Sequence, residues 1–156
     1  MTTIDPSGPG PMTVPDRLSE LLARVEAASG KLDDEALGRL LCATAGVQFG
    51  GTSTGTGDDG SDDFSVWSRD DQWSFNGYRH RMPDVSLDAA LALVERVLPG
   101  WGYDITYRAA WGNHTAAVIA NDRHAKPFVS AGKSAALALL AALLRALTQQ
   151  TDGADQ

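Results

Sequence analysis

The sequence predicts a single α+β domain, with a small antiparallel sheet that has helices packed on both faces in an α/β/α sandwich and an N-terminal helical pair. Several segments repeat apolar residues at helical spacing, and shorter segments in the middle of the chain alternate apolar and polar residues. The chain has 156 residues, of which 43% are hydrophobic, and this size fits one domain with one core.

Two helices are predicted near the N-terminus. The first is expected to begin after Asp16, a favourable N-cap, and to end before Gly30. Its apolar residues recur at helical spacing: Leu18, Leu21, Leu22 and Val25. Asp33 is expected to cap the second helix, which ends at Gly46. The apolar stripe of this second helix is formed by Leu37, Leu40 and Leu41.

A polar segment and two strands follow. Residues 50–63 contain glycine, threonine, serine and aspartate and no apolar side chain, so we expect a solvated loop. Strands are predicted at 64–67 and 73–78. The polar residues 68–71 between them favour a β-hairpin.

Two more helices are predicted in the second half of the chain. Ser86 is expected to cap the first of them, and Pro99 with Gly100 ends it. Its predicted buried face contains Leu87, Ala90, Leu91, Val94 and Leu98. Ser130 is expected to cap the last helix, whose leucines are Leu137, Leu139, Leu140, Leu143, Leu144 and Leu147. Because these leucines occupy more than one face, the helix is either sandwiched within the chain or shared with a second copy in a homo-oligomer.

Between these helices, residues 103–108 alternate apolar and polar side chains, which predicts a strand with one solvated face. Gly112 and Asn113 then favour a turn into a second strand at 114–120. We expect the two strands to be antiparallel neighbours.

The predicted domain covers residues 16–149, with 50–63 as a loop insert. Residues 1–15 contain four prolines and few large apolar side chains, a composition expected of a flexible tail. Residues 150–156 are expected to form a disordered tail.

Three runs of residues carry a family resemblance: SLDAALALVERVLPGWGYDITY at 86–107, SAALALLAALLRAL at 134–147, and DRLSELLARVEAASGKLDDEAL at 16–37. They resemble the phage ABA sandwich domain family of small phage and prophage proteins, most strongly over residues 84–148. The resemblance implies a sheet of a few strands between helices, in a protein that a phage or an integrated element encodes. It implies no catalytic residue, because none is generally established for the family. Val129 to Lys133 departs from the Thr-Pro by which such proteins usually enter the last helix.

The net charge disfavours two classes of binding partner, and the cysteine content excludes an intramolecular disulfide. Thirteen Lys and Arg residues against 20 Asp and Glu residues give a net charge of −7, which disfavours generic binding to nucleic acid or to anionic membranes. Cys42 is the single cysteine, so an intramolecular disulfide is excluded. We expect no signal peptide and no membrane-spanning stretch, and we expect a location in the cytoplasm of a bacterial host.

Three patterns that could indicate chemistry are incomplete. Gly132-Lys133-Ser134 resembles part of a phosphate-binding loop, but Pro127 stands where that loop needs its first glycine. The acidic residues at 58–63 lack the glutamate of a helix-flanked calcium loop. His80, His114 and His124 match no short metal-ligand motif and are expected at the surface. We therefore predict no catalytic residue, no metal site and no cofactor.

The most interface-like segment contains the residue types that dominate interface energetics, namely Trp73, Phe75, Tyr78, Arg79 and Arg81. The acidic partner-binding candidates beside it are Asp58, Asp59, Asp62, Asp63, Asp70 and Asp71. These residues favour a non-enzymatic phage accessory protein that binds a host or phage protein. One alternative is an inhibitor of a bacterial defence complex with a partly DNA-mimicking acidic surface. Another is a hydrolase or nuclease whose site is built from scattered histidines and aspartates.

Overall fold

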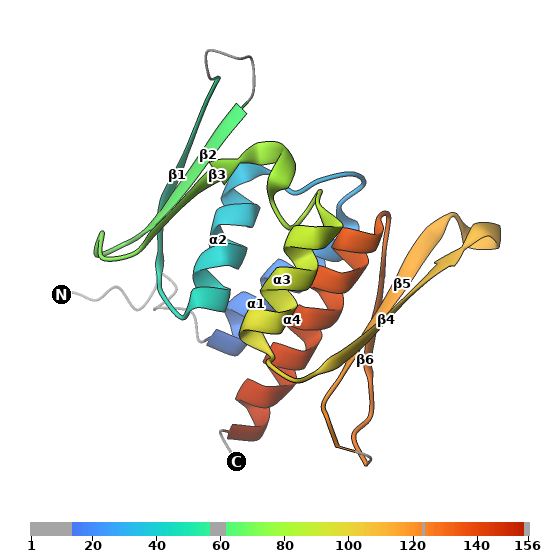
Figure 1. Ribbon diagram of the computed structural model, residues 1–156. Helices are drawn as coiled ribbons and strands as arrows, with labels where there is room; N and C mark the ends of the chain where they lie inside the picture. Colours follow the sequence, from blue (N-terminus) through green and yellow to red (C-terminus); the bar gives the residue numbers. More distant parts are fainter. Residues whose placement is uncertain (1–13, 57–61, 123, 155–156) are drawn as a thin grey trace, which may run out of the picture.

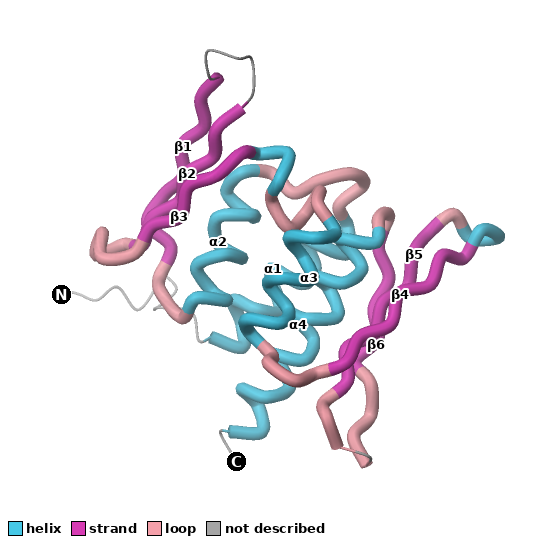
Figure 2. The backbone as a smooth tube through the Cα atoms, in the orientation of Figure 1, coloured by secondary structure: helices cyan, strands magenta, loops and turns pink. Residues whose placement is uncertain are grey.

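The computed structural model describes residues 14–56, 62–122 and 124–154, and it confirms the predicted α+β class (Figure 1). These residues form four helices and two three-stranded antiparallel sheets, with the helices packed against the sheets. The strands are divided between two sheets instead of one, and the helices lie between the two sheets (Figure 2).

The N-terminal helical pair is present as predicted. Helix α1 covers Val14–Ala27, so Asp16 lies inside its first turn and is not the residue before the helix. Helix α2 covers Asp34–Ala45. Its N-terminus is capped by the Asp33 carboxylate, which accepts a hydrogen bond of 2.7 Å from the backbone N–H of Ala36. At the other end, Gly46 adopts the left-handed conformation with φ of 77°, which favours glycine.

The first sheet consists of β1 (Phe49–Thr56), β2 (Asp62–Ser68) and β3 (Ser74–Tyr78) in the order β1-β2-β3. The β2–β3 pair confirms the predicted hairpin. The predicted loop at 50–63 is wrong over β1 and at the start of β2, because β1 pairs with β2 along its length. Backbone hydrogen bonds stabilise such a strand without apolar side chains of its own, so composition alone did not reveal it.

The second sheet consists of β4 (Gly102–Arg108), β5 (Asn113–Ile119) and β6 (Phe128–Gly132) in the order β4-β5-β6. The β4–β5 pair confirms the two predicted antiparallel neighbours. Strand β6 was not predicted, and it contains Ser130, which therefore does not cap the last helix. Ser134 caps it instead, since its Oγ accepts a hydrogen bond of 3.1 Å from the backbone N–H of Leu137.

Helix α3 (Leu87–Val97) connects the two sheets, and the Oγ of Ser86 caps it as predicted by accepting a 3.2 Å hydrogen bond from the backbone N–H of Ala89. Ala90, Val94 and Leu98 are buried as predicted, and Leu91 is half-buried. The prediction is wrong for Leu87, which is exposed, and it missed Leu93, which is buried. Helix α3 packs against α4.

Helix α4 covers Ala135–Ala154 and is the centre of the core. It packs against β5 and β6 on one side and against α1 and α3 on the others. The leucines from Leu137 to Leu144 are fully buried within the chain, so the helix is sandwiched. The expected tail from residue 150 is wrong over 150–154, where the helix continues.

The chain repeats one order of elements. Helix α2 is followed by the three strands of the first sheet, and α3 is followed by the three strands of the second sheet. Helix α2 packs on β1 and β2, and α4 packs on β5 and β6, so each sheet turns one face toward the shared helical layer (Figure 1).

Candidate functional site

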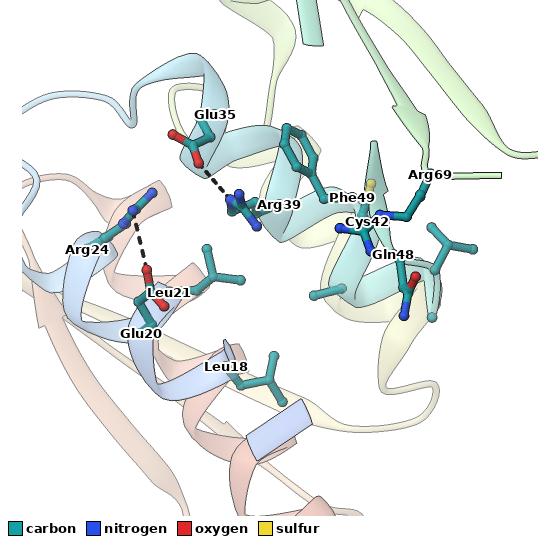
Figure 3. Close-up of a pocket in the computed structure, with 13 residues that line it drawn as sticks. Leu18, Glu20, Leu21, Arg24, Glu35, Arg39, Cys42, Gln48, Phe49 and Arg69 are labelled. Atoms are coloured by element: carbon teal, nitrogen blue, oxygen red, sulfur yellow. Dashed lines mark hydrogen bonds and ion pairs between the residues drawn. The ribbon is translucent and has the colours of Figure 1, made fainter. Parts of the chain in front are cut away.

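A pocket of about 490 Å³ opens where α1, α2 and the start of β1 meet (Figure 3). Leu18 and Leu21 line it from α1, and Val47 and Phe49 line it from the segment after α2. Helical spacing places Leu18 and Leu21 on one face of α1, where both are nearly buried. The pocket therefore has an apolar floor.

The left-handed turn at Gly46 builds the opposite wall. The backbone N–H groups of Gly46 and Val47 donate to the carbonyls of Ala43 and Cys42, which ends α2 and reverses the chain direction. Phe49 then begins β1 beside α2, and the Arg39 guanidinium lies 4.6 Å from the centre of its ring. This contact is a cation–π interaction that holds the aromatic wall.

The rim of the pocket carries both positively and negatively charged side chains. Glu20 pairs with Arg24 at 3.3 Å on α1, and Glu35 pairs with Arg39 at 2.8 Å on α2 (Figure 3). Arg69 lines the same pocket from the end of β2, is exposed, and makes no ion pair within the described part of the chain. The rim thus has three guanidinium groups and two carboxylates.

A second depression of about 370 Å³ shares the lining residues Gly46, Val47, Gln48 and Arg69 with the pocket. Asp70 also lines this depression, but its carboxylate already accepts hydrogen bonds from the Ser68 hydroxyl at 2.7 Å and the Gln72 backbone N–H at 3.1 Å. These hydrogen bonds hold the pKa of Asp70 below its ordinary value. The two depressions together form a groove from α1 to the β2–β3 turn, which we call the α1–α2 groove.

Cys42 lines this groove but is buried. Burial raises the pKa of its thiol, which disfavours the reactive thiolate form. The Sγ atom lies 4.0 Å from the carbonyl oxygen of Trp67. Cys42 is therefore a buried packing residue of the groove floor.

The predicted aromatic and arginine segment is divided between the core and the surface. Trp73 and Phe75 are half-buried and pack against the hydrophobic core. Tyr78 is 41% exposed, and it stacks on His80 with ring centres 5.8 Å apart. The Arg81 guanidinium lies 5.5 Å from the centre of the Tyr78 ring. The structure thus brings Tyr78, His80 and Arg81 together on the surface.

Arg79, from the same segment, is buried and makes four side-chain hydrogen bonds within the chain. It donates to both carboxylate oxygens of Asp84 at 2.8 and 2.7 Å, to Asp34 at 3.1 Å, and to the carbonyl of Leu32 at 2.6 Å. Asp84 is completely buried and also accepts from the backbone N–H of Leu32 at 2.8 Å. Arg79 therefore uses four of its five N–H groups to connect the start of α2 to the segment before α3, and its burial keeps it from a partner.

The predicted acidic residues do not form one surface. Asp62 and Asp63 lie at the start of β2, and Asp70 and Asp71 lie beyond its other end. Asp63 is directly opposite Tyr78 in the β2–β3 pairing. Asp58 and Asp59 lie outside the described residues.

The histidines are also separated. His80 is in a short 3₁₀ helix after the first sheet, His114 is in β5 of the second sheet, and His124 follows β5. Residues 14–56, 62–122 and 124–154 contain no group of three or more His, Cys, Asp or Glu side chains that could hold a metal ion. Gly132 contributes to packing: a Cβ atom there would lie 2.7 Å from the backbone nitrogen of Ala138.

Sequence reasoning missed two surfaces. The α1–α2 groove depends on the tertiary approach of α1, α2 and the β1–β2 end, where the Arg69 backbone N–H donates to the Gln48 carbonyl, and the sequence contains no local signal for this approach. Tyr103 and Tyr107 of β4 were expected on the buried face of a strand, yet they are 50% and 57% exposed. The alternating pattern identified the strand correctly but not how far the helices cover it.

Within the same three ranges, no helix has the length and apolar content needed to cross a membrane. Comparison of the chain with protein-family models, with curated proteins and with solved structures finds no match.

Proposed function

We propose that the chain is a non-enzymatic binding protein that holds a short extended segment of another protein in the α1–α2 groove. The observation that supports this most directly is the position of Arg69, an exposed guanidinium without an acidic partner in the described part of the chain, beside the apolar floor. A pocket with an apolar lining and a few polar groups at its rim is the usual form of a binding site.

The chemistry of the groove specifies the segment. An apolar side chain would fill the space between Leu18, Leu21 and Val47, and a carboxylate one or two residues away would pair with Arg69. Guanidinium and carboxylate groups form the stronger, charge-assisted class of hydrogen bond. The preferred ligand is therefore an acidic peptide segment with neighbouring leucine-like residues.

The resemblance to small phage and prophage proteins supports a phage accessory role, with a phage or host protein in the bacterial cytoplasm as the source of the segment. The two alternatives receive less support from the geometry. A DNA-mimicking surface needs a continuous row of acids, whereas Asp62 and Asp63 are separated from Asp70 and Asp71 by the length of β2. A hydrolytic site needs convergent groups, whereas His80 follows the last strand of the first sheet and His114 lies in the second sheet.

The experiment uses two fluorescently labelled, blocked hexapeptides, one with a single aspartate between leucines and one with lysine in its place. Fluorescence anisotropy measures their dissociation constants with the wild-type protein, Arg69→Ala and Arg96→Ala. Arg96 is an exposed arginine on α3, outside the groove, and serves as the matched control. We expect the aspartate peptide to bind more tightly, and we expect Arg69→Ala alone to weaken it roughly tenfold or more, as for loss of a charged hydrogen bond.

Equal binding of the two peptides, or equal affinity of both variants for the aspartate peptide, would contradict the proposal. Nuclear magnetic resonance gives the location independently. The methyl signals of Leu18, Leu21 and Val47 are expected to shift on addition of the peptide, while those of Val118 on the far sheet stay in place.

A further inference from the structure

Strand β4 lies at one edge of the second sheet, and the helical layer covers this edge least. The contacts of α4 with the sheet are concentrated on β5 and β6. Tyr103 is opposite the fully buried Val118, and Ile105 is opposite the buried Ala116, so these β4 residues lie on the face that turns toward the helices. Tyr103 and Tyr107 nevertheless keep half or more of their side-chain surface exposed. The edge therefore combines open backbone with large uncovered side chains, a combination that is prone to pairing with another strand.

The charges along β4 indicate which strand would pair with it. Asp104 and Arg108 lie on the opposite face from the tyrosines, four residues apart, with Thr106 midway between them. An antiparallel strand of the same sequence, centred on Thr106, places Asp104 opposite Arg108 of the second copy and Arg108 opposite its Asp104. Opposite charges directly across an antiparallel pair are stabilising, and like charges are destabilising.

The other face of β4 is complementary in the same register. Ile105 is placed opposite Tyr107 of the second copy, and Tyr107 opposite its Ile105. Aromatic and β-branched residues are favourable cross-strand partners. A single register therefore gives favourable cross-strand side-chain pairs on both faces of β4.

We propose that two copies of this chain associate through β4, antiparallel and centred on Thr106, to form a continuous six-stranded sheet. Pairing about a two-fold axis uses the same patch on both copies and closes the assembly at two. In this register Tyr107 of each copy is covered by Ile105 of the other copy, and Tyr103 lies diagonal to the other copy's Tyr107. Arg108 has five N–H donors, so it can bind Asp104 of the second copy while it keeps its contacts within its own chain. This proposal is independent of the α1–α2 groove, which is formed by other elements.

The test measures the dissociation constant of the dimer by sedimentation equilibrium of the full chain. Asp104→Arg and Arg108→Asp each create two like-charge pairs in the proposed register, and each is expected to weaken association roughly tenfold or more. Asp63→Arg makes the same charge change as Asp104→Arg at an exposed strand position of the first sheet, and is expected to leave the dimer unchanged. Circular dichroism checks that every variant is folded.

Mixing gives the sharper result. A copy with Asp104→Arg has two arginines on this face of the strand, and a copy with Arg108→Asp has two aspartates. An equal mixture of the two variants is expected to dimerise at concentrations at which each alone is monomeric, and the Asp104→Arg/Arg108→Asp double variant is expected to recover the wild-type dissociation constant. A wild-type chain that is monomeric at all concentrations, or a dimer that both single variants leave intact, would overturn the proposal. Single variants that weaken the dimer but do not recombine in the mixture would overturn the register and the proposal with it.

Discussion

Arg79 illustrates what a single residue does in this fold. Its neighbours in sequence, His80 and Arg81, are exposed, so local sequence indicates a surface arginine. Its hydrogen-bond partners are the carboxylates of Asp34 and Asp84 and the carbonyl of Leu32. Asp34 and Leu32 are 45 and 47 residues away from Arg79 in the sequence. Buried charges need such complete pairing, because an ion that leaves water without a partner costs several kcal/mol.

Removal of Arg79 is therefore expected to destabilise the fold strongly. Arg79→Ala leaves the completely buried Asp84 carboxylate without its guanidinium, and we expect the free energy of unfolding to fall by about 3–5 kcal/mol. Urea denaturation followed by circular dichroism measures this change.

The matched control for that experiment is Arg81→Ala, which removes an exposed arginine two residues away. Its effect is expected to stay within about 0.5 kcal/mol. Adding Asp84→Asn to Arg79→Ala should restore part of the loss, since a neutral amide costs less to bury than a carboxylate. If Arg79→Ala proved no more damaging than Arg81→Ala, the buried ion pair would not exist in solution.

At the scale of elements, glycines determine where a helix and a strand approach closely. Strand β6 meets the start of α4 at Gly132, where a Cβ atom would lie 2.7 Å from the nitrogen of Ala138 and 3.0 Å from the carbonyl carbon of Leu137. Both of these are backbone atoms, so no rotamer change relieves the contact. Gly132→Ala is expected to lower the free energy of unfolding by about 1–3 kcal/mol, as for overpacking of a core.

Gly55 in β1 provides the comparison, because a Cβ atom there would have nothing within 4 Å. Gly55→Ala is expected to change stability by no more than about 0.5 kcal/mol. Thermal unfolding of the two variants in parallel measures the difference. Equal midpoints would mean that β6 and α4 are further apart than described.

Elements with a strong local signal could be predicted, and elements that depend on tertiary pairing could not. Asp33 with Gly46 and Ser86 with Pro99 mark helix ends through caps and stops that act within one turn. Strand β1 has no alternation of apolar and polar side chains. At Gly51, for example, the strand supplies no side chain, and Trp67 of the neighbouring strand packs against the glycine instead. Strand β6 is short. Its Ser130 is buried and donates a hydrogen bond to the Glu26 carboxylate of α1.

The candidate site was harder to predict than the fold for a related reason. Aromatic and arginine content identified Tyr78 and Arg81 as surface residues, but the same rule also selected Arg79, which is buried. The α1–α2 groove combines residues from 18 to 69, and only the folded chain brings them together.

The whole molecule has one core shared by two sheets. The buried apolar residues of α1, α2, α3 and α4 and of both central strands belong to a single cluster. Neither sheet has a second helical layer of its own within the described residues, so we expect the two sheets to unfold together.

Amide hydrogen exchange tests this cooperativity with a substitution on one side of the molecule. Leu140→Ala removes a fully buried side chain of α4, which packs on the second sheet, and is expected to cost about 2–5 kcal/mol. Protection of amides in β2 of the first sheet should fall by the same free energy as protection in β5. A loss confined to β5 would show that the sheets are separate cooperative units.

The positions of the tryptophans allow intrinsic fluorescence to report on both sheets. Trp67 lies across Gly51 in the first sheet, two residues before Arg69, whereas Trp101 stacks on Phe128 near the start of β4, with ring centres 6.1 Å apart. Trp67 follows the buried Val66, which faces Gly38 of α2, so its indole lies on the face of the first sheet that is turned away from α2, whereas Trp101 lies against the second sheet. Two more tryptophans are present, Trp73 and Trp111. The difference between the emission of the wild-type protein and that of Trp67→Phe therefore reports on the first sheet, and the difference for Trp101→Phe reports on the second sheet, without any attached dye.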